Sequence, residues 1–198
     1  MKIIFIGDIV GRSARERLIN KLPEIKSLYT PDVIVANAEN AASGYGLTKN
    51  IAISLLESGV DVITLGNHSW DQKEMLSFIE ECPKIIRALN YPEGVPGKGF
   101  YEITLEDGRR CIVVQLLLRL FMGMSLDDPF NAAINFLKSE KLGKTCQAIL
   151  VDLHGEATSE KNAMAHYLDG RVSAILGTHT HVPTSDQRIL RGGTAYQT

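Results

Sequence analysis

Apolar runs that alternate with helix-like stretches constrain the fold of this 198-residue chain more than any other feature. The runs are rich in Val, Ile and Leu, which is typical of strands buried on both faces of a sheet. Strands are predicted at 2–6, 32–37, 60–65, 100–105, 111–118, 148–153 and 172–176. Helices are predicted at 13–26, 50–58, 72–81, 131–140 and 159–168. This alternation indicates a layered α/β domain.

One segment departs from the alternation. Residues 91–108 begin with a stretch rich in Gly and Pro, which predicts a loop ahead of the strand at 100–105. The turn-forming residues 106–109 then predict a hairpin into the strand that begins at Cys111. The sheet is therefore expected to contain at least one antiparallel pair.

Length, charge and cysteine content exclude several classes of protein. A chain of 198 residues is expected to form a single domain over 1–198. Its 21 basic and 23 acidic side chains argue against stable binding of nucleic acid or of an anionic membrane. No apolar stretch reaches the roughly 18 residues of a membrane span. Three cysteines without a short pairing argue against a disulfide framework and predict a cytoplasmic protein.

Polar residues follow the predicted strands at the points where the strands end. Because the carboxyl ends of parallel strands meet at one edge of a sheet, these side chains are expected to gather there. They offer carboxylate, amide and imidazole groups, a donor set for two divalent metals. The donors are Asp8, Glu39, Asn40, Asn67, His68, His154, His179 and His181.

Each of these residues taken alone also has an ordinary structural explanation. Asp8 could cap a helix, residues 39–40 could form a solvated loop, and residues 67–68 could cap the next helix. His154 alone would more often be a hydrogen-bonded core histidine. Residues 179–181 carry two histidines at alternate positions, which point the same way on an extended segment. Because four of the five histidines follow predicted strands, the combination favours a metal site.

Taken in order, the motifs resemble the calcineurin-like metallophosphoesterase superfamily. Its pattern is an Asp after the first strand, a bridging acid after the second, Gly-Asn-His after the third, a single His, and a final Gly-x-His-x-His. Here the pattern reads Gly7-Asp8, Glu39-Asn40, Gly66-Asn67-His68, His154 and Gly177-Thr178-His179-Thr180-His181.

Two departures narrow the resemblance. The superfamily usually has Asp-x-His in its first motif, and Val10 stands here in place of that histidine. The second motif usually carries Gly-Asp, which is replaced here by Asn37-Ala38-Glu39-Asn40. Both departures look like the bacterial YmdB family of phosphodiesterases, in which the Asn after the bridging Glu is a metal ligand. Chains of that family continue for several dozen residues beyond the segment at 193–198, so this chain is expected to lack the family's C-terminal segment.

The resemblance implies a fold, a cofactor and a substrate class. The fold is an α/β/β/α-type sandwich with the metal site at the carboxyl ends of its strands. Family members carry two iron or manganese ions and act on cyclic nucleotides, notably 2′,3′-cyclic nucleoside monophosphates. One metal would be held by Asp8, Glu39, Asn40 and His181, and the other by Glu39, Asn67, His154 and His179, with Glu39 as the bridge.

The chemistry that follows is hydrolysis of a small phosphodiester by a metal-bound hydroxide. His68 comes directly after the ligand Asn67 and is the candidate general acid for the departing ribose oxygen. Asp71 could orient His68, although an ordinary helix-start acid is the more common role of such a residue. The small residues around Ser43 and Gly44 could let backbone amides approach the phosphate, and Arg12 is a further candidate contact.

Two other interpretations remain open at this point. A nucleotide-binding α/β module without catalysis would explain Gly7 and Gly11, but the dinucleotide-binding G-x-G-x-x-G spacing is absent. A regulatory protein with weak residual phosphatase activity would keep the same fold. A homo-oligomer is compatible with any of the three.

Overall fold

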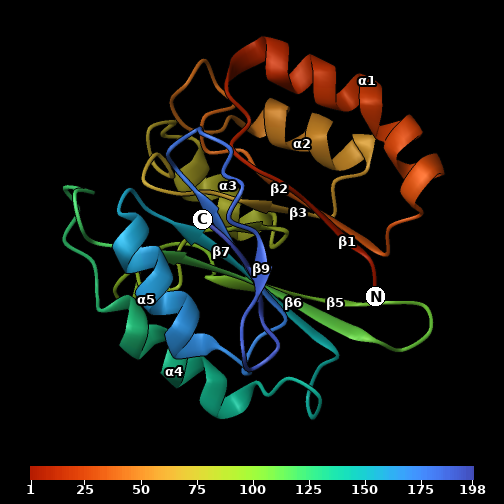
Figure 1. Ribbon diagram of the computed structural model, residues 1–198. Helices are drawn as coiled ribbons and strands as arrows, with labels where there is room; N and C mark the ends of the chain where they lie inside the picture. Colours follow the sequence, from red (N-terminus) through yellow and green to blue (C-terminus); the bar gives the residue numbers. More distant parts are fainter. The chain divides into compact units, whose positions relative to one another are not determined.

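The computed structural model describes residues Met1–Thr198, which form ten strands and five helices. The chain divides into two compact units with one β-sheet each. Unit 1 comprises Met1–Arg87 with Pro96–Lys98, and unit 2 comprises Ala88–Val95 with Gly99–Thr198. The predicted α/β class is therefore confirmed, and its strands belong to two sheets (Figure 1).

Unit 1 is built on a parallel sheet of four strands in the order β1-β2-β3-β4. The strands are β1 (Ile3–Ile6), β2 (Val33–Asn37), β3 (Val62–Thr64) and β4 (Ile85–Ile86). The helices are α1 (Gly11–Tyr29), α2 (Lys49–Ser58) and α3 (Met75–Glu81). Helices α1 and α2 lie side by side over the sheet (Figure 1).

Local chemistry and burial together determine these elements. Helix α2 begins where the Thr48 hydroxyl accepts a hydrogen bond from the Ile51 amide (3.3 Å), and it ends at Gly59, whose φ of 107° suits glycine. Alternate residues of β2, Ile34 and Ala36, pack into one core with apolar side chains of the three helices. The helices thereby hold the sheet and the loops at its carboxyl edge in place.

Unit 2 is built on a mixed sheet of six strands in the order β5-β6-β7-β8-β10-β9. Strands β6, β7, β8 and β10 are parallel, whereas β5 and β9 pair antiparallel at the two edges. The strands are β5 (Phe100–Thr104), β6 (Arg110–Leu117), β7 (Ala148–His154), β8 (Ala174–Thr178), β9 (Arg188–Ile189) and β10 (Ala195–Gln197). The predicted hairpin is confirmed, since the Leu105 amide donates to the Arg109 carbonyl (2.8 Å) between β5 and β6.

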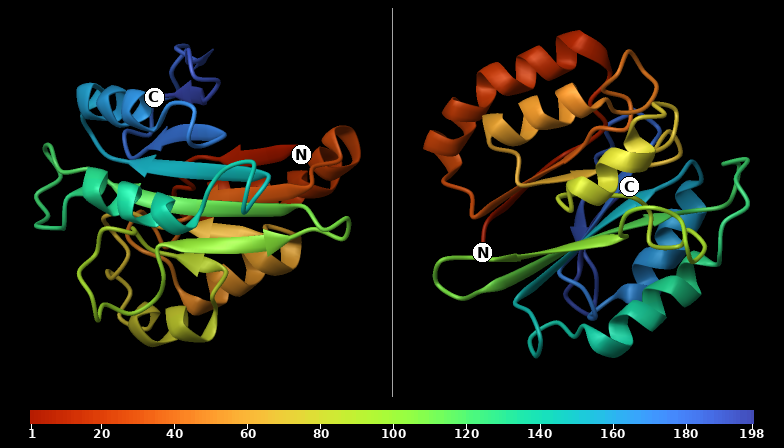
Figure 2. Two further views of the ribbon diagram at one scale, coloured as in Figure 1. Left: turned by 90° about the horizontal axis from the view of Figure 1, so that it is seen from below. Right: turned by 180° about the vertical axis from the view of Figure 1, so that it is seen from behind.

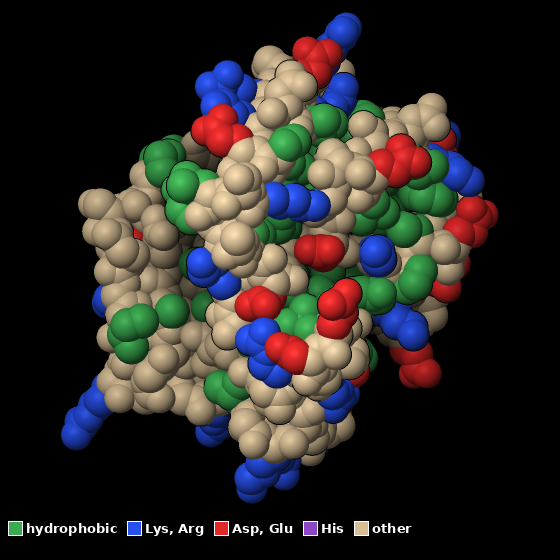
Figure 3. Space-filling model, turned by 90° about the vertical axis from the view of Figure 1, so that its right-hand side faces the viewer, with side chains coloured by type: hydrophobic (Ala, Val, Ile, Leu, Met, Phe, Trp, Pro, Cys, Tyr) green, Lys and Arg blue, Asp and Glu red, His purple; other side chains and the backbone are tan.

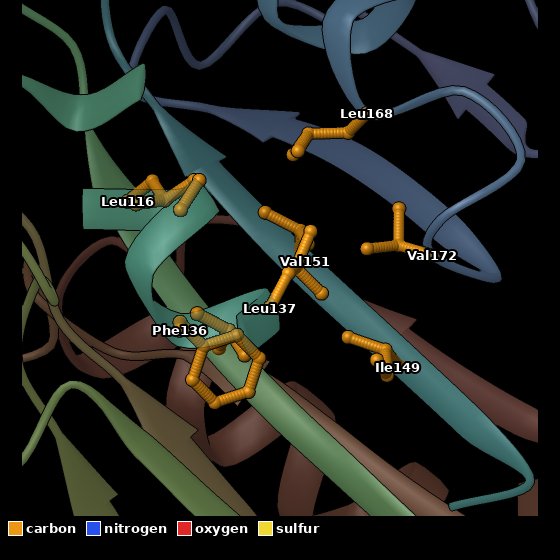
Figure 4. Close-up of a pocket in the computed structure, with 9 residues that line it drawn as sticks. Leu116, Phe136, Leu137, Ile149, Val151, Leu168 and Val172 are labelled. Carbon is orange, nitrogen blue, oxygen red and sulfur yellow. The ribbon is translucent and has the colours of Figure 1, made fainter. Parts of the chain in front are cut away.

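Two helices, α4 (Pro129–Ser139) and α5 (Thr158–Leu168), pack on one face of this second sheet (Figure 2). Helix α4 begins with Pro129 and is capped by Asp128, whose carboxylate accepts from the Phe130 amide (2.7 Å). A small apolar cavity of about 10 Å³ lies beneath the helices (Figure 4). Its lining comes from β6, β7, both helices and the segment before β8, as in Leu116, Phe136, Ile149, Leu168 and Val172.

The boundaries differ from the predicted ones where local turns replace regular structure. The helix predicted at 72–81 begins only at Met75, because residues 67–74 form successive turns and bends. Strands β4 and β9 were not predicted, since two residues carry no readable apolar pattern. No helix in the structure combines the length and the apolar character that crossing a membrane requires.

Basic and acidic side chains are interspersed on the face shown in Figure 3. This distribution accompanies the net charge of −2 and shows no broad field of one sign on that face.

Leucines in the last turns of two helices offer a matched test of the core. Leu168 of α5 is 1% exposed and lines the cavity, whereas Leu28 of α1 is 68% exposed. We expect Leu168→Ala to lower the free energy of unfolding by about 2–5 kcal/mol, because it enlarges an existing cavity. Leu28→Ala should change it by less than about 0.5 kcal/mol. Urea unfolding measures both, and equal losses would contradict the assigned core.

Candidate functional site

Three loops at the carboxyl edge of the unit 1 sheet carry the predicted donors of that unit. Because β1, β2 and β3 are parallel, the loops that follow them lie at the same edge. Backbone hydrogen bonds link the loops, from the Ile9 amide to the Asn37 carbonyl (3.0 Å) and from the Ala38 amide to the Thr64 carbonyl (3.0 Å). The edge carries Asp8 after β1, Glu39 and Asn40 after β2, and Asn67 and His68 after β3.

Glu39 is the most deeply buried carboxylate of this edge. It is only 1% exposed, and its Oε2 accepts a hydrogen bond from the His68 amide (2.9 Å). The side chain therefore reaches from the loop after β2 to the loop after β3. Burial of a carboxylate is costly unless hydrogen bonds or cations compensate its charge. A position between two loops that carry metal donors suits a carboxylate shared by two cations.

Asn40 is held so that its oxygen is the atom suited to bind a cation. The residue is 3% exposed, and its Nδ2 donates to the Gly44 carbonyl (2.8 Å). The Asn40 carbonyl also accepts from the Gly11 amide (3.0 Å), which ties the loop to the start of α1. Since the amide nitrogen is used within the loop, Oδ1 is the side-chain ligand atom that Asn40 can offer.

His68 pairs with Asp71 in the turn after β3. The His68 Nδ1 lies 2.7 Å from the Asp71 Oδ2, and the Tyr45 ring contacts the imidazole edge-on at a centroid distance of 5.2 Å. The helix-start role considered for Asp71 is wrong, because α3 begins only at Met75. Asp71 thus orients the imidazole, and Nε2 is the ring nitrogen suited to exchange a proton with a ligand.

The loop around Ser43 and Gly44 is a compact turn. Ser43 and Gly44 both have positive φ, 56° and 97°, and the Gly44 amide donates to the Asn40 carbonyl (2.9 Å). The Gly44 amide is therefore committed within the turn, so an anion contact through that amide is not supported. Arg12 lies on the surface of α1, where its Nε pairs with the Glu16 carboxylate at 2.6 Å.

In unit 2 the last residue of β7 is His154, which is completely buried. Its Nδ1 lies 2.8 Å from the Thr178 Oγ1, and the Thr178 hydroxyl donates to the Asp152 carboxylate (2.6 Å). His154 and Thr178 are register partners on neighbouring parallel strands. His154 is therefore a hydrogen-bonded histidine whose ring orientation is set by buried polar groups at the carboxyl end of the sheet.

His179 and His181 follow β8 in an unusual backbone conformation. The predicted extended segment is wrong, because β8 ends at Thr178 and the two histidines have φ values of 99° and 56°. Residues other than glycine adopt this left-handed region at a cost of about 1–3 kcal/mol, commonly at functional sites. The His179 ring packs edge-on against His154 at 5.0 Å, and its Nε2 lies 3.3 Å from the Glu156 carboxylate.

The donor chemistry of both units fits a divalent metal with oxygen and nitrogen ligands. Carboxylate, amide and imidazole groups are ligands for manganese, iron or zinc, whereas thiolates would favour zinc or iron–sulfur clusters. Burial raises the pKa of the Cys111 thiol to about 12, with a further contribution from Cys146, whose own pKa burial also raises. Both thiols therefore stay protonated at neutral pH, in keeping with a site built from oxygen and nitrogen donors.

Three residues of this arrangement were missed from the sequence. Asp152 lay within the apolar strand predicted at 148–153, Thr178 was only the unassigned residue between Gly177 and His179 of the final motif, and Tyr45 was treated as a loop residue. For Asp152 a signal exists, since a charged residue within an otherwise apolar strand requires a partner.

Comparisons with known proteins agree on one family. The family model described as YmdB-like protein matches residues 4–198. A Bacillus subtilis protein named 2′,3′-cyclic-nucleotide 2′-phosphodiesterase is 47% identical over 198 residues, which is 100% of this chain and 74% of that protein.

Two crystal structures are similar along the whole chain. One is of a hypothetical protein from Thermus thermophilus, with a TM-score of 0.92 and 47% identity, covering 100% of this chain and 75% of that chain. The other is described as a novel phosphatase from Mycoplasma pneumoniae, with a TM-score of 0.90 and 35% identity, covering 99% of this chain and 70% of that chain.

Gly46 closes the turn next to His68 and can be tested by substitution. A Cβ there would lie 2.9 Å from the Gln72 Cγ and 3.0 Å from its backbone nitrogen, at a φ of +78°. Gly94 has a similar φ of +87° but no atom within 4 Å of its Cβ position. We expect Gly94→Ala to lower the free energy of unfolding by about 1–2 kcal/mol, because alanine is strained in this left-handed backbone conformation. Gly46→Ala should lower the free energy of unfolding by about 1–3 kcal/mol more than Gly94→Ala, because its Cβ would also crowd Gln72. Equal losses in urea unfolding would argue against the close packing of the turn.

Proposed function

Because the chain belongs to the YmdB-like protein family, we propose that it is a metal-dependent phosphodiesterase that hydrolyses 2′,3′-cyclic nucleoside monophosphates. The observation that carries the proposal is the set of oxygen and nitrogen donors at the carboxyl ends of parallel strands in both units. The Bacillus subtilis relative, which bears the name of this activity, supports the choice of a cyclic nucleotide as substrate.

In this proposal residues 1–198 act as one domain that supplies the ligands of a two-metal centre. When bound, two divalent metals offset the charge of the phosphate and lower the pKa of a water molecule to about 7. Glu39 is the proposed bridge, since its buried carboxylate has two oxygens to share. The remaining ligands are Asp8, Asn40 and His181 on one side and Asn67, His154 and His179 on the other.

Manganese or iron are the proposed metals, because the donors are carboxylates, amides and imidazoles without a thiolate. The proposed compartment is the cytoplasm, since Cys82, Cys111 and Cys146 are all free thiols. The proposed partner is a small phosphodiester.

His68 is the proposed general acid of the reaction. Its Nδ1 is paired with Asp71 at 2.7 Å, so its Nε2 is the nitrogen that would deliver a proton to the departing ribose oxygen. Tyr45 packs against the ring and restricts its rotation. His68 would act on the leaving group without binding a metal, because its neighbour Asn67 is the proposed ligand of this loop.

Substitution of the proposed bridge tests the metal centre. We expect Glu39→Gln to lose bound metal and to lower hydrolysis of 2′,3′-cyclic AMP by roughly 10²-fold or more, because it removes charge shared by two cations. Elemental analysis of the purified protein measures the bound metal, and analysis of the products measures the rate of hydrolysis. Glu57→Gln, at an exposed position of α2, is the control and should match the wild type. Full metal content in Glu39→Gln would refute the bridge.

A second pair of substitutions separates chemistry from metal binding. We expect His68→Ala to retain its metals and to lose about 10²–10⁴-fold in rate on 2′,3′-cyclic AMP, whose leaving group needs a proton. The loss should be smaller on bis-nitrophenyl phosphate, since nitrophenolate leaves without protonation. His179→Ala should lose metal and fail on both substrates.

The control for this pair is His166→Ala, in the last turn of α5, which should behave as the wild type. Loss of metal in His68→Ala, or an equal loss of rate on both substrates, would show that the role assigned to His68 is incorrect.

A further inference from the structure

A row of buried polar side chains crosses three parallel strands of unit 2. Gln115 of β6 is the register partner of Asp152 of β7, and His154 of β7 is the register partner of Thr178 of β8. Gln115, Asp152 and His154 are completely buried, and Thr178 is 3% exposed. Buried polar groups are costly unless their hydrogen bonds are made, so their arrangement is tightly restricted.

Every link of this row has a defined direction. The Thr178 hydroxyl donates its only proton to the Asp152 Oδ1 (2.6 Å). The Gln115 Nε2 points to the other carboxylate oxygen, Oδ2, at 3.4 Å. The Thr178 Oγ1 also lies 2.8 Å from the His154 Nδ1. Because the hydroxyl proton is already used, Thr178 can only accept at this contact, and Nδ1 must carry the hydrogen.

The direction of these bonds determines which imidazole nitrogen can bind a cation. A neutral imidazole with its proton on Nδ1 has its lone pair on Nε2. Groups that hydrogen-bond the remote nitrogen of a histidine ligand commonly fix its tautomer and ring orientation. In this chain a carboxylate acts on the histidine through a hydroxyl group, so neither Asp152 nor Thr178 needs to touch a metal.

We propose that Asp152 and Thr178 are positioning residues that keep the proton of His154 on Nδ1 and reserve Nε2 for a divalent metal. This inference rests on the proposed function, in which His154 is a metal ligand. It adds that the ligand nitrogen is selected in the metal-free protein, before any ion binds. Substitutions that remove the acceptor at position 178 should therefore weaken metal binding without altering a ligand.

The test compares Thr178→Val with Thr178→Ser in the full chain. Valine keeps the shape of threonine and removes the oxygen, whereas serine keeps the oxygen. The tautomer of His154 is determined by ¹⁵N–¹H correlation spectra of the metal-free protein, with the signal assigned by its absence in His154→Gln. The affinity for Mn²⁺ alone is measured by titration of the same samples.

We expect the proton on Nδ1 in the wild type and in Thr178→Ser, and a mixture of tautomers in Thr178→Val. The Mn²⁺ affinity should fall about 10–100-fold in Thr178→Val and be largely restored in Thr178→Ser. Wild-type affinity in a folded Thr178→Val would overturn the inference and leave the proposed function standing. If Thr178→Val does not fold, the wild-type spectrum still decides, because a proton on Nε2 of His154 contradicts the inference.

A wild type that binds neither Mn²⁺ nor Fe²⁺, or a His154→Gln variant that binds Mn²⁺ normally, would instead overturn the proposed function. The two failures are therefore distinguishable, since one concerns the metal affinity of the wild type and the other the effect of position 178.

Discussion

Parallel pairing of strands is the constraint on which the rest of this structure depends. In unit 1 the pairing of β1, β2 and β3 places three loops at one edge, where backbone hydrogen bonds join them. In unit 2 the pairing of β6, β7 and β8 places the last residues of β7 and β8, His154 and Thr178, opposite each other. The apolar faces packed under the helices hold these edges rigid, so short polar side chains keep fixed positions. The proposed catalytic chemistry uses this geometry in both units.

Most of the fold could be predicted from the sequence, because long apolar runs separated by helix-like stretches have few alternative arrangements. Strand β7 illustrates this, since its run of buried residues was predicted at 148–153 and found at Ala148–His154. The edge strands β4 and β9 could not be predicted, since each has two residues and owes its pairing to its neighbours. The division into two sheets depends on long-range pairing that no local pattern encodes, and it was expected only from the resemblance to metallophosphoesterases.

The candidate donors could be named from the sequence, but their surroundings could not. His154 was recognised by its place after an apolar run, whereas its contact with Thr178 requires the register of β7 against β8. The left-handed conformation of His179 and His181 is equally invisible, because nothing in Gly177-Thr178-His179-Thr180-His181 distinguishes a turn from an extended segment. Asp71 was considered both as a partner that orients His68 and as a helix-start acid. The 2.7 Å contact with His68 and the late start of α3 decide for the partner.

Anomalous diffraction from crystals of the metal-loaded protein, collected at the absorption edges of manganese and iron, is the strongest test of the proposed two-metal centre. We predict two anomalous peaks per chain, one on each side of the Glu39 carboxylate, with His154 bound to one of them through Nε2. Peaks remote from the strand ends, or the absence of any peak in a crystal of active enzyme, would contradict it.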